Sequence, residues 1–218
     1  MTWPLGLLTP RGALHKLRDR SRYGPRAPML RELIHIDPHA IVGERKTEAA
    51  RAFQRQHGGA RALVVGGDWD LALTPVDPRA LGVYHSCHAH WVDGADWAQT
   101  PVYQSYQRKI AKGQPHPDCP TLPALEARYA ALDAIFTQVR DSGQMSEAPE
   151  DLITISLDRA GRLYWGPNGR HRVCIALVLG MTRIPARAGI VHAAALDAYQ
   201  ALRSQRRAPL NSLRGILT

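Results

Sequence analysis

The alternation of apolar and polar positions predicts a chain of short strands and helices. Brief apolar runs that end at turn residues indicate strands at 33–36, 61–65, 152–157, 163–165 and 184–191. Apolar positions at helical spacing indicate helices at 13–22, 46–56, 84–91, 100–112, 122–141 and 173–179. The segment 122–141 is the clearest of these helices, because an apolar face runs along it and Ser142-Gly143 follows as a stop signal.

Composition narrows the class of protein. With 44% hydrophobic and 22% charged residues over 218 positions, we expect a soluble globule, folded as one ordinary domain or two very small ones. The longest apolar run, 173–181, is far shorter than the roughly 18 residues that cross a bilayer. No basic segment precedes the first apolar stretch, as it would in a secretory signal, so a cytoplasmic location is predicted. Three cysteines are too few and too far apart for a disulfide framework.

The net charge of +9 is concentrated at the two ends of the chain. Residues 1–31 carry seven Lys and Arg against one Asp, and residues 183–218 carry six Arg against one Asp. Basic ends attract polyanions such as nucleic acid or an acidic membrane surface, and the simpler interpretation is a solvated tail that aids solubility. We expect a flexible basic arm over 1–28, a mostly helical region over 29–145, a core over 146–195 and a basic tail over 196–218.

A glycine-rich turn over 166–172 carries the most informative chemical signal. Its glycines let the backbone approach an anion, and the turn opens a helix whose dipole favours negative charge. Arginines can form charge-assisted bonds to phosphate, and a histidine can donate or shuttle a proton. The predicted phosphate-binding residues are Asn168, Gly169, Arg170, His171 and Arg172. The alternative is a capped helix with solvent-exposed arginines.

This part of the chain resembles a known family. The order strand, 158–161 turn, strand, 168–172 turn, helix, Leu179-Gly180 and Ile184-Pro185 is similar to the ParB/sulfiredoxin-like domain, whose signature is a Gly-x-His-Arg turn leading into a helix. The direct resemblance covers residues 152–191, and Gly67-Asp68-Trp69-Asp70 resembles a motif of an uncharacterised branch. The resemblance implies an α+β fold, in which a small mixed sheet has flanking helices and the chain adds helical N-terminal and middle extensions. It also implies that the turn binds the phosphates of a nucleotide.

The members of this superfamily differ in the residues that they need. They include nucleotide-hydrolysing DNA-partition proteins, an ATP-dependent reductase of oxidised cysteine, free-serine kinases and proteins labelled nucleases. The reductase requires a cysteine in the phosphate turn, which this chain lacks, and Cys174 is expected to be a buried small hydrophobe. The partition proteins require a further DNA-binding region, for which the chain after Val191 is too short. One departure from the branch is Val191-His192, which stands where an Arg-His pair is expected.

Asp68 and Asp70 are the carboxylates that a kinase-like reaction would need. Two carboxylates just after a strand can coordinate Mg²⁺ on a nucleotide, or one can act as the base while the other binds the ion. Trp69 between them could pack beneath the site or stack on a base. The alternative is a turn in which both side chains accept bonds from backbone amides. Thr100 and Tyr103 could line the cleft, although aromatic residues at helical spacing are more often core.

A cluster of His85, Cys87, His88 and His90, with His116 and Cys119 farther along, has zinc-binding chemistry. The spacing differs from that of a standard zinc finger, whose ligands come in separated pairs. On a helix, His85 and His88 share one face while Cys87 and His90 share another. Most of these histidines are therefore interpreted as surface or interface residues.

These expectations combine into one hypothesis with two alternatives. The hypothesis is a nucleotide-binding phosphotransferase or nucleotide hydrolase, such as a kinase that acts on a small-molecule acceptor, as the serine kinases do. It would use Mg²⁺ held by Asp68 and Asp70, ATP or ADP as the nucleotide, and Asp68, Asp70 and His171 as catalytic residues. The first alternative is a nucleic-acid-binding protein or metal-dependent nuclease, and the second is a non-catalytic partner protein whose basic arm docks at a membrane surface or on another protein.

Overall fold

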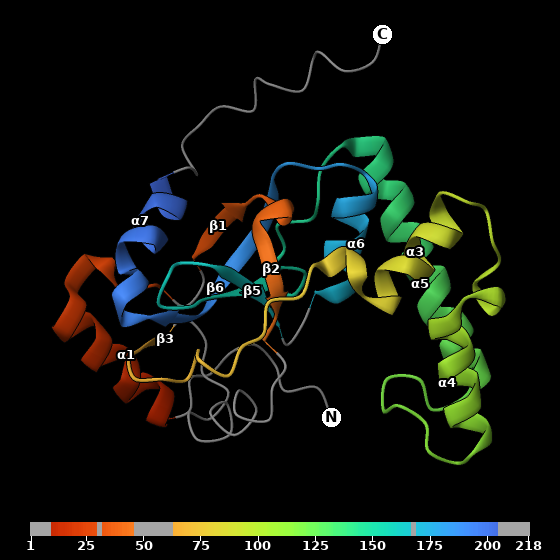
Figure 1. Cartoon of the computed structure of the whole chain (residues 1–218), viewed down its shortest axis with the longest axis horizontal. Helices are drawn as coiled ribbons and strands as arrows, with labels where there is room; N and C mark the ends of the chain where they lie inside the picture. Colours follow the sequence, from red (N-terminus) through yellow and green to blue (C-terminus); the bar gives the residue numbers. More distant parts are fainter. Residues whose placement is uncertain (1–9, 30–31, 46–62, 167–168, 205–218) are drawn as a thin grey trace, which may run out of the picture.

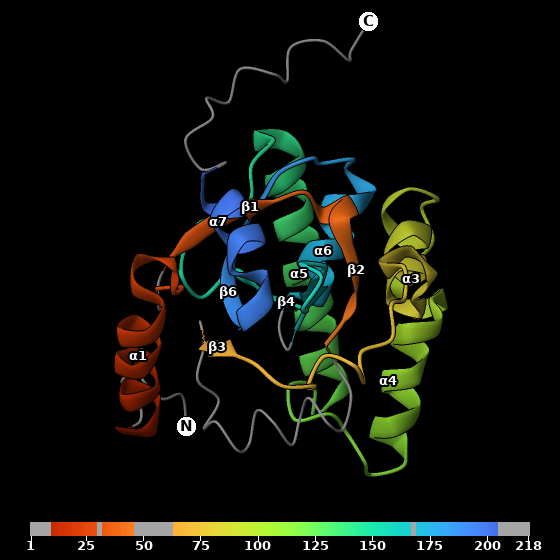
Figure 2. The same cartoon turned by 60° about the vertical axis from the view of Figure 1, so that its left-hand side comes forward.

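A six-stranded mixed sheet forms the centre of the protein (Figures 1 and 2). The computed structural model describes residues 10–29, 32–45, 63–166 and 169–204. The strands are β1 (Leu33–Ile36), β2 (Ile41–Glu44), β3 (Leu63–Val65), β4 (Ile153–Leu157), β5 (Leu163–Trp165) and β6 (Ile184–His192). Their order is β1-β6-β4-β5-β2, and β3 also pairs with β6. Because helices and a mixed sheet occur together, the predicted α+β class is confirmed.

β6 is the strand that organises the sheet. All nine of its residues are buried, as expected for a strand with neighbours on both sides. It runs antiparallel to β1 and parallel to both β4 and β3. β4 then turns back into β5, which is antiparallel to it, and β2 adds in parallel to β5. The carboxyl ends of β3, β4 and β6 therefore meet at one edge of the sheet, and the carboxyl end of β5 lies at the opposite edge.

Six α-helices surround the sheet in the described part of the chain. They are α1 (Pro10–Tyr23), α3 (Gly82–Trp91), α4 (Pro101–Ala111), α5 (Leu122–Ser142), α6 (Arg170–Val178) and α7 (Leu196–Ser204). Figures 1 and 2 place α1 and α7 on one side of the sheet and α3 and α4 on the other. One apolar core joins α5, α6 and α7 to the strands, and a second lies among α3, α4, α5 and α6. None of the described helices is both long and apolar enough to cross a bilayer.

Local signals set the ends of α5 as predicted. Thr121 caps its start by accepting a bond from the Ala124 amide, and Gly143 ends it in the left-handed conformation with φ +69°. The predicted 158–161 turn is also present: Asp158 Oδ1 accepts the amides of Ala160 and Arg162 at 3.0 and 2.9 Å.

The structure differs from the expected organisation at both ends of the chain. Residues 10–23, expected within a flexible arm, form α1, where the buried Asp19 Oδ2 accepts the Val64 amide at 2.9 Å. The tail expected from residue 196 begins as α7, which buries Leu196 and Tyr199 against the sheet. A buried carboxylate that accepts a backbone bond and two buried apolar side chains hold these segments on the core.

Two other expectations in the first half of the chain have different outcomes. β2 was missed, because Gly43 interrupts its short apolar run and its pairing partner β5 lies far away in the sequence. The helix expected over 46–56 lies outside the described residues.

Candidate functional site

The predicted phosphate turn leads into α6 through a glycine that no other residue could replace without strain. Gly169 is the N-cap of α6 with φ +99°, and a Cβ at this position would lie 2.9 Å from Ile153 Cγ1. α6 begins at Arg170, three residues earlier than predicted, so Arg170, His171 and Arg172 form its first turn. Asn168 lies outside the described residues. The turn sits where β4 starts, because Ile153 is the first residue of that strand.

The three charged or polar residues of this first turn have different surroundings. Arg170 Nη2 donates to Glu44 Oε1 at 2.8 Å, and Arg172 pairs with Asp151. Burial, assisted by Arg128 and Arg170, lowers the pKa of His171 to about 4. His171 is thus neutral at pH 7, and its buried Nε2 has no hydrogen-bond partner among the described residues. Of the three residues, Arg170 alone lines a hollow together with residues of α3 and α4.

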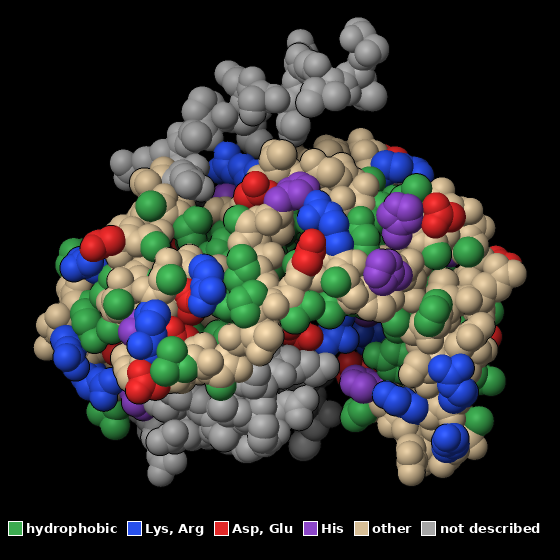
Figure 3. All heavy atoms as spheres, in the orientation of Figure 1, with side chains coloured by type: hydrophobic (Ala, Val, Ile, Leu, Met, Phe, Trp, Pro, Cys, Tyr) green, Lys and Arg blue, Asp and Glu red, His purple; other side chains and the backbone are tan. Residues whose placement is uncertain are grey.

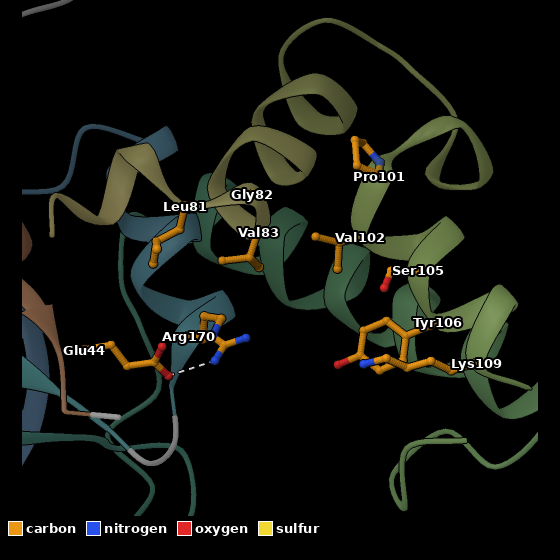
Figure 4. A pocket seen from close by; sticks show the side chains of 10 residues that line it. All are labelled: Glu44, Leu81, Gly82, Val83, Pro101, Val102, Ser105, Tyr106, Lys109 and Arg170. Carbon is orange, nitrogen blue, oxygen red and sulfur yellow. Dashed lines mark hydrogen bonds and ion pairs between the residues drawn. The ribbon is translucent and has the colours of Figure 1, made fainter. Parts of the chain in front are cut away.

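That hollow, of about 410 Å³, lies between the starts of α3 and α6 and one side of α4 (Figure 4). Its lining combines apolar side chains, two hydroxyl groups, two cations and one carboxylate. The lining residues are Glu44, Leu81, Gly82, Val83, Pro101, Val102, Ser105, Tyr106, Lys109 and Arg170. Figure 4 shows the Tyr106 hydroxyl and the Lys109 ammonium group directed across the hollow toward Arg170.

Two helices begin at this hollow without a side-chain cap. The N-cap residues Leu81 of α3 and Gly169 of α6 provide no side-chain hydrogen bond to the first turn. Amides in the first turn of a helix lack partners within the helix, and the helix dipole adds partial positive charge at this end. The positive ends of α3 and α6 therefore reinforce the charges of Arg170 and Lys109.

Asp70 and Asp68 meet at a different place, around the side chain of Arg159. The Arg159 Nε and backbone amide both donate to Asp70 Oδ2 at 2.9 Å, and Nη2 donates to Asp70 Oδ1 at 2.8 Å. The same Nη2 donates to Asp68 Oδ1 at 2.7 Å. Asp70 is buried, whereas the Asp68 side chain is 76% exposed. The hydrogen bonds from Arg159 hold the pKa of Asp70 at about 2 against the opposing effect of burial.

His192 and Trp69 complete this cluster through bonds to the backbone. His192 Nδ1 accepts the Ala194 amide at 3.1 Å, so its Nε2 carries the proton and donates to the Gly67 carbonyl at 3.0 Å. Trp69 Nε1 donates to the Val65 carbonyl at 3.3 Å, and the Trp69 and His192 rings lie 6.2 Å apart. These contacts fix the 66–70 loop to the ends of β3, β4 and β6, which is a structural role.

The Asp68–Asp70 cluster and the phosphate turn do not form one site. The cluster lies at the carboxyl end of β4, next to Asp158 and Arg159, whereas a Cβ at Gly169 would lie 2.9 Å from Ile153 Cγ1, at the amino end. The strand from Ile153 to Asp158 rises about 3.3 Å per residue, so the two places are roughly 17 Å apart. The hairpin explains the separation, because β5 carries the chain back along β4 before α6 begins.

Thr100 and Tyr103, the other predicted cleft residues, belong to the core. Thr100 is 1% exposed and its hydroxyl donates to the Trp97 carbonyl at 2.7 Å. The Tyr103 ring packs edge-on against Tyr129 with centroids 4.9 Å apart. Cys174 is 2% exposed in the same core, which confirms its interpretation as a buried apolar residue. Thr100 and Tyr103 do not line the hollow.

The histidines around residues 85–90 contact different partners and do not converge on one point. His88 Nδ1 lies 3.2 Å from Asp93 Oδ2, and His90 contacts Asp133 and stacks on Trp97. Cys87 is buried beside Cys174. Within the described ranges, no three His, Cys, Asp or Glu side chains are arranged to hold a metal ion.

Sequence analysis missed one residue of the Asp68–Asp70 cluster and two residues of the hollow. Arg159 had a signal, since it lies in the predicted hairpin turn at the end of a buried strand. Glu44 ends the undetected β2, and Lys109 lies on a predicted helix among other exposed cations. Nothing in the local sequence indicates that either residue faces Arg170.

No family model, curated protein or solved structure matches this chain. The resemblance to the ParB/sulfiredoxin-like domain remains a prediction based on residues 152–191.

The Asp70–Arg159 contact predicts an acid-dependent loss of stability. The folded pKa of Asp70 is about 2, below the value of about 3.9 expected for an unfolded chain. The contact therefore stabilises the protein fully above pH 4, and its contribution disappears as the pH falls from about 4 to about 2. After allowance for solvent near Arg159, we expect the contact to contribute about 1–2 kcal/mol to the free energy of unfolding above pH 4. Urea unfolding of the wild type and of Asp70→Asn measures this contribution between pH 4 and pH 2. The two proteins should differ less in free energy of unfolding as the pH falls. A difference that stays constant would contradict a low pKa for Asp70.

Proposed function

We propose that the protein binds a nucleotide in the hollow between α3, α4 and α6. The observation that carries the proposal is that Arg170 and Lys109 both line a hollow of about 410 Å³ with apolar walls. Sites for small molecules commonly have volumes of about 300–1,000 Å³, with apolar walls and a few polar groups that fix the orientation. The cations would hold the phosphates, and Leu81, Val83 and Val102 would contact the base or sugar.

The charges of the hollow favour a phosphate over an uncharged ligand. Arg170 uses Nη2 to bind Glu44, which leaves other guanidinium donors for a second acceptor. Lys109 supplies a second charge from α4, and the uncapped starts of α3 and α6 add partial positive charge. Two full charges opposed by the one carboxylate of Glu44 leave a net positive site.

We extend the proposal to phosphoryl transfer, with Glu44 as the general base. Glu44 lines the hollow, whereas Asp68 and Asp70 lie at the other edge of the sheet and bind Arg159. Mg²⁺ bound to the nucleotide phosphates would neutralise charge in the transition state. The γ-phosphoryl group would pass to a hydroxyl of a small acceptor or to water, the hydroxyl proton would go to Glu44, and the nucleoside diphosphate would leave.

A thermal-shift screen tests nucleotide binding. ATP, ADP, CTP and GTP, each with and without Mg²⁺, are compared on the wild type, Arg170→Ala and Arg140→Ala. A ligand at 100 times its Kd stabilises the folded state by about 2.7 kcal/mol, which raises the midpoint of a domain this size by roughly 5–10 °C. We expect such a rise in the wild type and in Arg140→Ala, whose residue is exposed on α5, and its loss in Arg170→Ala. No shift with any nucleotide would overturn the proposal.

Glu44→Gln separates binding from chemistry. The amide keeps a hydrogen-bond acceptor for Arg170 but cannot take up a proton, and it removes the one negative charge that opposes the cations, so nucleotide affinity should stay the same or rise. Turnover of the nucleotide should fall by about 10²–10⁴-fold, the range for loss of a general base. Release of nucleoside diphosphate is measured beside Glu126→Gln, an exposed residue of α5. Equal turnover in both variants would exclude Glu44 as the base.

A further inference from the structure

The contacts of α1 with the sheet determine which side of this helix faces solvent. Asp19 is 1% exposed and its carboxylate accepts the Val64 amide of β3. Lys16 Nζ donates to the Pro28 carbonyl at 3.1 Å, and burial lowers the pKa of Lys16 to about 8. Residues 16, 19 and 23 lie on one side of a helix with 3.6 residues per turn, so this side of α1 faces the protein.

The opposite side of α1 combines exposed leucines with arginines. Leu14 and Leu17 are 66% and 70% exposed. With about 100° of rotation per residue, these leucines and Ser21 form the centre of the outward face, Arg18 and Arg22 lie along one border, and Arg20 lies along the other. Figure 3 shows Lys and Arg side chains next to hydrophobic ones over α1, at the lower left of the view.

We propose that this outward face of α1 docks on an anionic lipid surface. A helix that lies on a membrane has an apolar centre that enters the boundary between headgroups and acyl chains, and basic borders that contact acidic headgroups. The arrangement of Leu14 and Leu17 between arginines has this form. Arginines alone would suit nucleic acid equally well, but a phosphate backbone offers no apolar partner for two exposed leucines.

The position of α1 makes docking compatible with an open hollow. α1 lies at one side of the sheet, whereas the hollow lies among α3, α4 and α6 at the other (Figures 1 and 2). The charge distribution agrees with an orientation in which α1 faces the membrane, because residues 1–31, which include α1, hold seven cations against one acid. Each Lys or Arg near an acidic surface adds to the attraction, which decays within a Debye length.

Vesicle co-sedimentation of the full chain tests the proposal. The probes are vesicles of phosphatidylcholine alone and vesicles with about one third phosphatidylglycerol, compared at low and physiological salt. The variants are Leu14→Ser/Leu17→Ser and Arg18→Glu/Arg22→Glu. Their matched controls are Leu71→Ser, which changes another leucine that is 66% exposed, and Arg140→Glu on α5. Circular dichroism of each variant confirms that it is folded, since all the changed side chains are exposed.

We expect binding to the acidic vesicles only, at least tenfold weaker in both double variants and unchanged in both controls. Equal binding by Leu14→Ser/Leu17→Ser and the wild type would overturn the proposal, as would equal binding to both kinds of vesicle. A short DNA duplex is titrated in parallel. Binding to the duplex that is lost in the arginine variant and kept in the leucine variant, without binding to vesicles, would assign this face to nucleic acid instead.

Discussion

Replacing Arg159 by methionine is expected to lower the free energy of unfolding by about 1–3 kcal/mol, because the buried Asp70 carboxylate loses its side-chain partner. The Asp70 carboxylate is buried, and Arg159 donates four of its hydrogen bonds, one of them from the backbone amide. Methionine keeps the backbone bond and much of the side-chain volume but leaves the charge without its partner. A buried charge that loses its partner costs at least as much as the intact pair contributes, and solvent at the partly exposed Arg159 limits the loss.

Two further variants make this expectation specific. Arg140→Met removes an arginine that pairs with Asp141 on the surface, and it should cost less than about 1 kcal/mol. Arg159→Met combined with Asp70→Asn removes the uncompensated charge and should recover part of the loss. Urea unfolding at neutral pH measures all three. If Arg159→Met is as stable as Arg140→Met, the cluster does not hold the 66–70 loop to the hairpin.

Replacing Gly169 by alanine is expected to cost about 2–4 kcal/mol of stability. The left-handed backbone with φ +99° disfavours any side chain, and the new Cβ would lie 2.9 Å from Ile153 Cγ1 at the start of β4. Gly180→Ala is the matched control, because that glycine also has positive φ, +63°, but no atom lies within 4 Å of its Cβ position.

The difference between the two glycine variants measures the contact with Ile153 together with the added cost of φ +99°, which lies beyond the left-handed range that other residues adopt. We expect Gly180→Ala to cost about 1 kcal/mol, the conformational part of the effect. Thermal or urea unfolding of both variants gives the comparison. Equal losses in the two variants would mean that the first turn of α6 can move away from Ile153, and the placement of Arg170 at the hollow would lose its support.

Elements with strong local signals could be predicted from the sequence. The cap and stop residues of α5 and the turn at Asp158 act within a few residues, so their effect is visible in the sequence. β2 and the packing of α1 and α7 depend on partners far along the chain, such as β5 for β2 and Val64 for Asp19. No local pattern specifies such partners.

The candidate site shows the same limit more sharply. The sequence predicts that Arg170 and Asp70 are site residues and that both lie near strand ends. It could not show that these are opposite edges of the sheet, because that depends on the direction of β5 relative to β4. It also could not show that Glu44 and Lys109 come to line the same hollow as Arg170.

Calorimetric titration of ATP with Mg²⁺ tests the central claim most directly, because a variant in the hollow can be compared with one at the Asp68–Asp70 edge of the sheet. Lys109→Ala removes a cation from the hollow, Lys112→Ala removes an exposed cation of the same segment, and Asp68→Asn changes the exposed carboxylate beside Arg159. If ATP binds in the hollow, its affinity should be at least tenfold weaker for Lys109→Ala than for the wild type. Its affinity for Lys112→Ala and Asp68→Asn should stay within about twofold of the wild-type value. Loss of affinity in Asp68→Asn with Lys109→Ala unaffected would contradict binding in the hollow and place the nucleotide at the Asp68–Asp70 edge.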